Sequence, residues 1–448
     1  MNVREIIAQT LYELETGSRK SHLLIRDVLD KYDYLDSKDK AFFKRVTEGT
    51  LARRLTLDYV ADKYSKKPMN KCKPMIRVII RMSIYQLMFM DKVPNHSVID
   101  EAVKLTKKLS RSEFTGFVNA LLRNVAGNLP GLEKEIETLP ESLRLSVKYS
   151  MPEWLVKMFL KEQKNAESLI ASLNEIRPTC VTIKDLSKKD DILSAWDEDD
   201  VKYEVSSYFD NTFLVSGFEG AYMLEGFDSG DLIIRDESSM LAAMAAGVKP
   251  GDDIVVIDVC AAPGGKTTTI AATLQGSGKV YSRDLTEDKV SMIKENIERL
   301  GLLNVYPQVF DATVFDPDME GKADVVICDL PCSGLGVMGR KSDIRYNISN
   351  EIMRDLCILQ REILSVAQRY VKPGGILIYS TCTIHKAENE KQVKYILDNF
   401  DFEGDSIKDI LPELFKEGKE RECDYMVCLR PDVDNTDGFF VSRFRKKK

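Results

Sequence analysis

Residues 253–267 read DIVVIDVCAAPGGKT, an apolar run that ends in a glycine-rich loop. A short, continuous apolar run bounded by a turn predicts a strand buried on both faces of a parallel sheet. Gly264 and Gly265 let a ligand approach the backbone without a Cβ in the way, and Lys266 opens a helix whose N-terminus favours an anionic group. The loop matches neither the GxGxxG of dinucleotide-binding folds nor the GxxxxGKS/T of nucleoside triphosphatases. It therefore predicts a cofactor loop of another kind.

Strand-like and helix-like segments alternate on both sides of this loop. Strands are expected at 253–259, 279–284, 305–310, 324–330 and 375–381, and helices near 266–275, 286–300, 351–371 and 386–398. A last strand is expected at 437–446, as an antiparallel partner. Apolar strands that alternate with amphipathic helices predict an α/β domain with a doubly covered parallel sheet. We place this domain at residues 229–448.

The part of the chain that precedes this domain divides into two further regions. Residues 1–135 predict an all-helical domain, with helices over the first turns of the chain and near 38–58, 74–90, 96–109 and 113–126. The segment GNLPGLEKE then indicates a boundary. Residues 136–228 predict a small α/β middle domain, with helices at 151–163 and 166–175, a strand at 180–184 and a strand-like piece, GAYMLEG, at 220–226.

Composition indicates an ordinary globular chain of 448 residues with 44% hydrophobic and 30% charged residues. The nine cysteines are scattered without a CxxC pair, and Glu5 and Glu13 interrupt the N-terminus, so we expect a reduced, cytoplasmic protein without a signal peptide. Three well-separated histidines argue against a zinc site, and no metal is expected. The apolar stretch 75–90 is too short to span a bilayer and contains two arginines, so no membrane role is expected.

The net charge of −7 argues against a protein that coats nucleic acid, but the basic residues are clustered. One cluster runs from residue 63 to 81 without an acidic residue, and consists of Lys63, Lys66, Lys67, Lys71, Lys73, Arg77 and Arg81. Another contains Arg340, Lys341 and Arg345, and the chain ends in RFRKKK. Charge runs are commonly solvated surface. Three of them together favour an anionic partner.

Two cysteines each follow an expected strand of the α/β domain, Cys332 in DLPCSG and Cys382 in YSTCT. Because the carboxyl ends of parallel strands share one edge of a sheet, both thiols should meet the glycine-rich loop there. Free cysteines are often small buried hydrophobes, and a nucleophilic thiol, whose pKa is ordinarily ~8.5, needs local help to ionise. Asp329 lies three residues before Cys332, in the same mouth. The residues leave open which of the two thiols attacks.

Two further aspartates follow strands of the same domain. Asp284 ends the second expected strand, 26 residues after Asp258, and is placed to take ribose hydroxyls of a nucleoside. Asp311 ends the third expected strand, where it can reach a base edge. Aspartates at such positions commonly cap the following helix. Three in successive strand ends, Asp258, Asp284 and Asp311, favour a nucleoside site.

The motifs APGGKT, DESSM, DLPCSG, YSTCT with Glu388-Asn389-Glu390, and DGFFVSRFRK resemble those of the RNA cytosine-5 methyltransferases of the RsmB/NOP family. The resemblance covers 229–448 and implies a Rossmann-like domain that uses S-adenosyl-L-methionine. The segments DKAFFKRVTEGTLARR and FTGFVNALLRNV resemble the NusB-like RNA-binding domain. This domain order is similar to the branch that modifies 16S ribosomal RNA, which implies a monomeric enzyme acting at position 967 of that RNA.

The resemblance also implies roles for individual residues. It assigns attack on cytosine C6 to Cys382 and release of the product to Cys332, with Asp329 stabilising the adduct at N3. It implies a base extruded from its stack. The residues it places around the cofactor are Cys260, Ala261, Ala262, Pro263, Gly264, Gly265, Lys266, Asp284, Asp311 and Asp329.

Three alternatives compete with this interpretation. A non-enzymatic RNA-binding protein of the antitermination type would need only the N-terminal region, and the intact cysteine pair and cofactor loop count against it. A nicotinamide dehydrogenase is disfavoured by the missing GxGxxG. The same chemistry on transfer RNA or 23S ribosomal RNA stays open.

Overall fold

The computed structural model describes residues 2–17, 19–110, 112–218, 220–416, 419, 421 and 423–448. The chain packs into two compact units, which we call the helical unit and the sheet unit. The helical unit comprises Met1–Asn174 and Met338–Asn347, and the sheet unit comprises Glu175–Val337 and Ile348–Lys448. These units divide the chain at residues other than the expected limits of 1–135, 136–228 and 229–448, which stay predictions.

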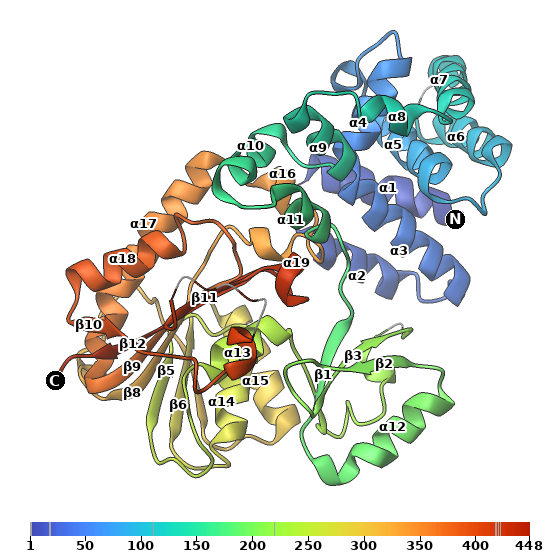
Figure 1. Ribbon diagram of the computed structural model, residues 1–448. Coiled ribbons are helices and arrows are strands. Elements are labelled where there is room, and N and C mark those ends of the chain that lie inside the picture. Colours follow the sequence, from blue (N-terminus) through green and yellow to red (C-terminus); the bar gives the residue numbers. More distant parts are fainter. Residues whose placement is uncertain are drawn as a thin grey trace. The chain divides into compact units, whose positions relative to one another are not determined.

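The helical unit is built from short helices joined by tight turns (Figure 1). In chain order they are α1 (Val3–Thr16), α2 (Ser21–Lys31), α3 (Ser37–Ala52), α4 (Arg54–Tyr64), α5 (Pro74–Phe89), α6 (Asn95–Leu109), α7 (Thr115–Asn128), α8 (Leu132–Ile136), α9 (Glu141–Tyr149), α10 (Glu153–Glu162), α11 (Ala166–Ser172) and α16 (Ile344–Asn347). The expected helical character of the N-terminal region is confirmed.

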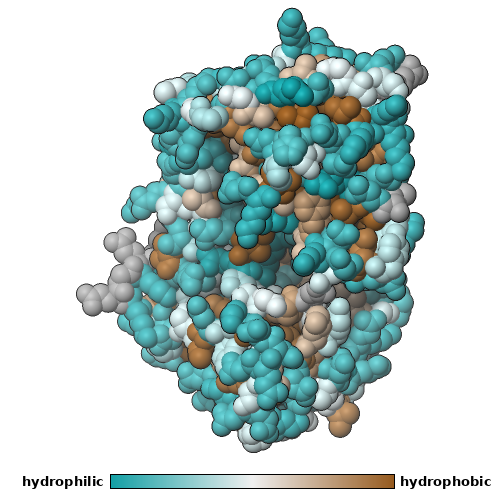
Figure 2. Space-filling model, turned by 90° about the vertical axis from the view of Figure 1, so that its right-hand side faces the viewer, coloured by the Kyte–Doolittle hydropathy of each residue, from teal (hydrophilic) through white to brown (hydrophobic). Residues whose placement is uncertain are grey.

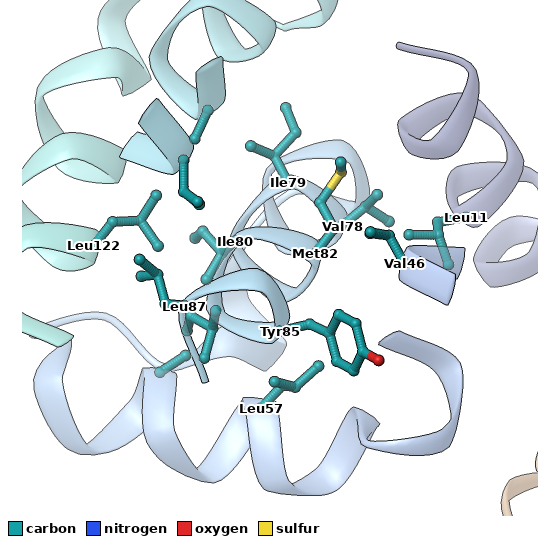
Figure 3. Packing of buried hydrophobic residues seen from close by; sticks show 14 of the residues in the cluster. Leu11, Val46, Leu57, Val78, Ile79, Ile80, Met82, Tyr85, Leu87 and Leu122 are labelled. Atoms are coloured by element: carbon teal, nitrogen blue, oxygen red, sulfur yellow. The ribbon is translucent and has the colours of Figure 1, made fainter. Parts of the chain in front are cut away.

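Helix α5 forms the centre of this unit, which explains the apolar stretch at 75–90. Pro74 is its first residue, where the missing N–H costs no hydrogen bond. Figure 3 shows side chains of α5 pointing towards Leu11, Val46 and Leu122 of neighbouring helices. A Cβ added at Gly49 would overlap the Tyr85 ring, so helix α3 packs closely on α5 only because residue 49 is glycine. The apolar side chains on all sides of α5 therefore indicate a helix that is buried in the core.

The single helix expected at 38–58 is wrong, because two helices, α3 and α4, meet at Arg53. The first amides of α4 have a tertiary partner, since the Ser150 hydroxyl oxygen accepts from Leu55 N at 2.9 Å and from Thr56 N at 3.3 Å. Such an acceptor satisfies the amides that a helix start leaves free. It comes from a residue far along the chain, so the local pattern could not reveal the break.

The sheet unit contains a small antiparallel sheet in strand order β2-β3-β1-β4. Its strands are β1 (Thr179–Ile183), β2 (Lys202–Val205), β3 (Thr212–Ser216) and β4 (Leu232–Ile234), accompanied by α12 (Lys189–Glu198). The fully buried Trp196 of α12 makes edge contacts with Tyr203 and Phe213. The strand-like piece expected at 220–226 is wrong: Ala221–Met223 form a 3-10 turn between Gly220 and Leu224. Because β4 pairs with β1, the expected limit at 228 separates a strand from its sheet.

The large sheet has the order β10-β12-β9-β8-β5-β6-β7, with β11 paired to β12. Its strands are β5 (Val255–Asp258), β6 (Lys279–Asp284), β7 (Val305–Val309), β8 (Ala323–Asp329), β9 (Val371–Thr381), β10 (Phe402–Gly404), β11 (Met426–Leu429) and β12 (Phe439–Lys446). Strands β5 to β9 run parallel, and β12 is antiparallel to β9 as expected. The predicted α/β fold is confirmed.

Helices cover both faces of this sheet (Figure 1). One core joins α13 (Glu237–Met244), α14 (Gly265–Thr273) and α15 (Glu287–Leu300) to one face. The other joins α17 (Asn350–Ala367) and α18 (Glu390–Asn399) to the opposite face. The strand order reverses between β8 and β5, and ligands of open α/β sheets bind at such a switch point, outside the carboxyl ends of the strands. The glycine-rich loop leaves the sheet at this point.

Several residues of the expected basic clusters serve the interior. Arg81 is buried and binds Asp58 through Nε and Nη2, at 2.6 and 2.8 Å. Arg345 is 1% exposed and donates to Tyr149 O and Asn174 Oδ1. Lys66, Lys67, Lys71 and Lys73 stay exposed. The clusters are thus smaller at the surface than the sequence indicated.

Hydrophilic residues cover most of the face drawn in Figure 2, with smaller apolar areas between them. Among the residues that the structure describes, no helix is long and apolar enough to cross a membrane.

Candidate active site

The glycine-rich loop connects β5 to α14 and is held from both sides. Asp284 Oδ2, at the end of β6, accepts from Ala262 N at 2.9 Å. From α15, Asn296 Nδ2 donates to Pro263 O at 3.0 Å. Gly264 has φ +103°, which L side chains rarely adopt, so glycine is required where the loop turns into α14. The loop therefore presents its backbone in one fixed shape at the switch point.

Lys266, in the first turn of α14, links this loop to the end of β8. Its Nζ donates to Asp329 Oδ2 at 2.6 Å and to Ser239 Oγ of α13 at 2.9 Å, and lies 4.9 Å from the Phe439 ring centroid. The other Asp329 oxygen accepts from Ser380 Oγ at 2.9 Å. Asp329 is thus oriented by a cation and a hydroxyl, while 29% of its side chain stays exposed.

A cavity of about 240 Å³ lies beside the loop. Its lining contains all seven residues from Cys260 to Lys266 and also Asp329, and it includes Arg235, Asp236 and Ser239, to which the sequence assigned no role. Asp236 and Ser239 belong to the DESSM motif, which the sequence placed just before the loop, and Arg235 directly precedes that motif. The structure therefore brings most of the expected cofactor residues to one hollow.

Asp284 and Asp311 are outside the lining of this cavity. Asp284 is 4% exposed, and its Oδ1 accepts from Leu285 N and Lys289 Nζ, both at 2.8 Å. Asp311 does not end β7 as expected, because the strand stops at Val309. It is exposed, and Thr313 donates to its Oδ1 through N and Oγ1, which lowers the pKa of Asp311. Asp284 therefore supports the loop, and Asp311 caps its own turn.

Asp258, the last residue of β5, is fully buried behind the loop. Thr267 Oγ1 donates to its Oδ2 at 2.8 Å. Burial raises the pKa of Asp258 to about 7, because the charged carboxylate loses its hydration there.

The two cysteines of the expected pair meet at the same edge. Asp329 and Ser380 are neighbours across β8 and β9, and Cys332 and Cys382 follow in the loops after these strands. Their Sγ atoms are 3.3 Å apart. Both residues are partly exposed. The sequence-based prediction that they converge is confirmed by this distance.

The two thiols influence each other. The hydrogen bond with Cys382 is the largest cause that raises the pKa of Cys332 well above its ordinary value, followed by burial and the charges of Cys382 and Glu388. Two thiols at this distance cannot both ionise easily, because the second negative charge meets the first. The pair therefore favours a state in which at most one sulfur is a thiolate.

Glu388 lies behind the pair and was quoted in the sequence only as part of a motif. It is fully buried, and its carboxylate accepts from Ser333 N at 2.8 Å and Ser333 Oγ at 2.5 Å. Gln360 Nε2 also donates to it, at 3.2 Å. The spacing of an acidic motif six residues after Cys382 was a signal that the sequence did supply.

Two family models match this chain. One, described as 16S rRNA methyltransferase RsmB/F, matches residues 245–445, and the NusB family model matches residues 1–127. With the sheet order and the loop described above, they define an RNA methyltransferase that uses S-adenosyl-L-methionine and carries a NusB-type helical domain.

Full-length relatives narrow this class. The chain is 32% identical, over 100% of its own length and 99% of the relative's, to the probable ribosomal RNA small subunit methyltransferase B of Bacillus subtilis. It belongs to the 16S rRNA methyltransferase RsmB/F family.

Solved structures agree on the fold. The crystal structure of PH0851 superposes with a TM-score of 0.81 at 24% identity, over 100% of this chain and 99% of that one. A methyltransferase homologue from Pyrococcus horikoshii covers 69% of this chain and 99% of its own, with a TM-score of 0.55 at 26% identity.

Proposed function

We propose that the protein methylates C5 of a cytosine in 16S ribosomal RNA through a covalent adduct between Cys382 and C6. The observation that carries this proposal is the 3.3 Å pair of cysteines beside Asp329, at the edge that also holds the cofactor loop. The family model and the relatives named ribosomal RNA small subunit methyltransferase B support the choice of RNA.

The chemistry requires a nucleophile because cytosine C5 is too poor in electrons to attack a methyl sulfonium. Addition of the Cys382 thiolate at C6 makes C5 enamine-like and splits one hard step into easier ones. We assign the thiolate to Cys382, as the resemblance to the RNA cytosine-5 methyltransferases implies, and the raised pKa of Cys332 supports this choice. S-adenosyl-L-methionine, when bound, supplies the methyl group that C5 takes.

Asp329 is our candidate for stabilising the adduct at N3. Charge builds up on N3 when the thiolate adds to C6, and a positioned proton donor or hydrogen bond lowers the energy of that state. The Lys266 ammonium donates to one Asp329 oxygen, so a proton is available within the same hydrogen-bonded group. The exposed part of Asp329 faces solvent and can meet a base.

Cys332 is our candidate for the release step. After methyl transfer the C5 proton must leave and the bond from C6 to Cys382 must break. Once Cys382 is bound to C6 it carries no negative charge, which removes one of the causes that raise the pKa of Cys332 and makes it easier for Cys332 to ionise and accept the C5 proton. The proximity of the two sulfurs then places Cys332 beside the carbon that loses its proton.

The residues around the cavity fit the proposed methyl donor. The loop backbone from Cys260 to Gly265 and the N-terminus of α14 can hold its carboxylate. Asp284 Oδ2 keeps an acceptor site for a ribose hydroxyl, and we retain Asp311 as the candidate for the base edge. Asp329 borders the cavity and is also near the cysteines, so it would separate donor and acceptor sites.

The target base must leave its stack to reach this edge, which costs least in loops or single strands. Exposed lysines of the helical unit, Lys66, Lys67, Lys71 and Lys73, are candidates for holding flanking phosphates. Transfer RNA and 23S ribosomal RNA stay alternative substrates.

Two cysteine variants test the mechanism. Cys382→Ala should abolish methyl transfer, because no adduct can form. Cys332→Ala should leave a protein–RNA adduct that is visible on a denaturing gel. An adduct with Cys382→Ala and none with Cys332→Ala would reverse the two roles.

A labelled S-adenosyl-L-methionine assay on 16S, 23S and transfer RNA, with mapping of the modified base, tests the substrate. We expect label on C5 of a cytosine in 16S ribosomal RNA. Label that enters only transfer RNA would overturn this assignment.

A further inference from the structure

We propose that Glu388 is a positioning residue whose buried carboxylate ties the Cys332 loop to the Cys382 loop and so fixes the unequal roles of the two thiols. This inference rests on the proposed function, because it concerns how the attacking and releasing cysteines are held. Glu388 accepts from Ser333 in the loop after β8 and lies beside His385 in the loop after β9, so it acts through these two loops.

The strand ladder between the two loops ends before the cysteines. Its last pairing joins Asp329 to Ser380, and Leu330 N still donates to Ser380 O at 3.1 Å. Beyond this point β8 and β9 have turned into loops, which a backbone hydrogen bond from Gly336 N to Cys382 O, at 3.1 Å, still joins. The positions of the two thiols depend on this bond and on the side chains that connect the loops.

Glu388 supplies the most buried of these connections. Its carboxylate takes two hydrogen bonds from Ser333, the residue after Cys332. On the other side His385 Nδ1 lies 3.1 Å from Oε1, and Ser333 Oγ meets Thr383 Oγ1 at 2.8 Å. Both Thr383 and His385 belong to the Cys382 loop. The Glu388 carboxylate therefore contacts the neighbour of Cys332 directly and reaches the neighbour of Cys382, Thr383, through the Ser333 hydroxyl.

The network is anchored to the sheet and to α17. Tyr379 of β9 donates through its hydroxyl to Glu388 O, and Gln360 Nε2 donates to Glu388 Oε2 and to Pro331 O. The side chains of Tyr379, Gln360 and Glu388 are all buried. A buried polar network with its donors and acceptors matched is rigid, and a single lost member leaves the others unsatisfied. Glu388 therefore holds the two loops, and with them the Cys332 and Cys382 thiols, in place against the rigid core.

The charge of Glu388 supports the same division of roles between the thiols as its contacts do. Its negative charge is one cause that raises the pKa of Cys332, after Cys382 and burial. The other titratable groups that face Glu388 are His385 in its own loop, Cys357 of α17 and Tyr379 of β9. Among the described residues, no Lys or Arg side chain forms an ion pair with Glu388. A carboxylate there favours the protonated form of Cys332.

The first test measures the ionisation of Cys332 without any RNA. In a Cys382→Ala background, iodoacetamide alkylation of Cys332 is followed against pH by peptide mass spectrometry, with Glu388 or with Glu388→Gln. Loss of the charge should move the alkylation midpoint to lower pH by about one unit. The exposed Glu351→Gln, on α17, is the matched control and should leave the midpoint in place. An unchanged midpoint in folded Glu388→Gln protein would overturn the electrostatic part.

The second test measures positioning. Adduct formation is timed in a Cys332→Ala background, where the adduct accumulates. Glu388→Ala should slow it about 100-fold, since misplacement by an ångström costs that much, and Glu388→Gln should recover part of the rate because its amide oxygen still accepts from Ser333 N. Equal rates for all three proteins would overturn the proposal. S-adenosyl-L-methionine binding verifies the fold of each variant.

The two failures are distinguishable. If no cysteine variant forms an adduct, the proposed function fails, while the alkylation midpoint still decides whether Glu388 controls Cys332. If the adduct forms but ignores residue 388, only the present inference fails.

Discussion

The helical unit and the catalytic edge of the sheet unit both bury charged side chains, but they use them differently. In the helical unit Arg81 is closed between Asp58 and Glu15, with hydrogen bonds of 2.6 to 3.1 Å. At the sheet edge Lys266 also binds a carboxylate, and Asp329 is 29% exposed against 22% for Asp58. Exposure alone separates the two pairs little, but Asp329 also borders the cavity beside the glycine-rich loop, where a ligand can reach it.

This difference distinguishes structural from functional ion pairs in this chain. A buried pair that satisfies all its donors and acceptors internally serves the fold, and breaking it should cost stability. Breaking a pair at the edge of the cavity, such as Lys266 with Asp329, should instead lower activity.

The largest effect is expected at the sheet edge. Asp329→Asn removes the carboxylate that we assign to N3 and should lower methyl transfer about 10³- to 10⁴-fold, or about 4–5.5 kcal/mol in the barrier. Single-turnover rates with labelled S-adenosyl-L-methionine measure it. Asp355→Asn, an exposed change on α17, is the control. A tenfold loss or less would remove Asp329 from the chemistry.

The next effect is expected in the helical unit. Arg81→Met leaves Asp58 without its arginine, while Glu15 keeps Arg77, and should lower the free energy of unfolding by about 3 kcal/mol, the lower end for breaking a buried pair. The chain has two tryptophans, Trp154 in the helical unit and Trp196 in the sheet unit. Urea unfolding followed by Trp154 emission, in a Trp196→Phe background, reports this unit. Loss of methyl transfer without loss of stability would mean that Arg81 serves function.

The third effect depends on pH. Asp258 has a pKa of about 7 in the folded protein against 3.8 ordinarily, so the folded state holds its proton more tightly than the unfolded state. Its stabilising contribution is complete below pH 4 and is lost as pH rises through 7. Between pH 5 and 8 this should cost the sheet unit about 3 kcal/mol.

The matching variant removes that pH dependence. Asp258→Asn still accepts from Thr267 but cannot ionise, so its stability should change much less between pH 5 and 8. Trp196 emission in a Trp154→Phe background follows the sheet unit. Equal slopes for the two proteins would show that Asp258 is ionised in the fold.

The same contrast explains what the sequence could predict. The strands β5, β6, β8 and β9 and the meeting of Cys332 with Cys382 followed from local patterns plus one rule about parallel sheets. The break at Arg53 and the true partners of Arg345 depend on residues more than 90 positions away, such as Ser150 and Tyr149. Charge clusters misled for the same reason, since sequence shows how many arginines lie together but not which carboxylates they meet.

Within the site, the limits of prediction were similar. The position of each thiol in its motif was visible, but the carboxylate that joins their loops acts through Ser333, 55 residues before it. Asp311 looked like a ligand because it follows a strand, whereas Thr313 two residues later takes up its Oδ1. A local turn thus competed with the expected role.

The smallest effect is expected for an ion pair that belongs to neither class. Lys104 binds Glu101 at 2.8 Å on α6, but 72% of the lysine side chain is exposed. Water screens such a pair, and the two long side chains lose freedom when they meet, so it contributes little to stability. Lys104→Met should therefore leave Trp154-detected unfolding and methyl transfer almost unchanged, and raising the salt concentration should remove what difference remains. The comparison with Arg81→Met is direct, because both changes remove one cation from the same unit. If Lys104→Met cost as much stability as Arg81→Met, burial would not be what distinguishes structural pairs in this protein.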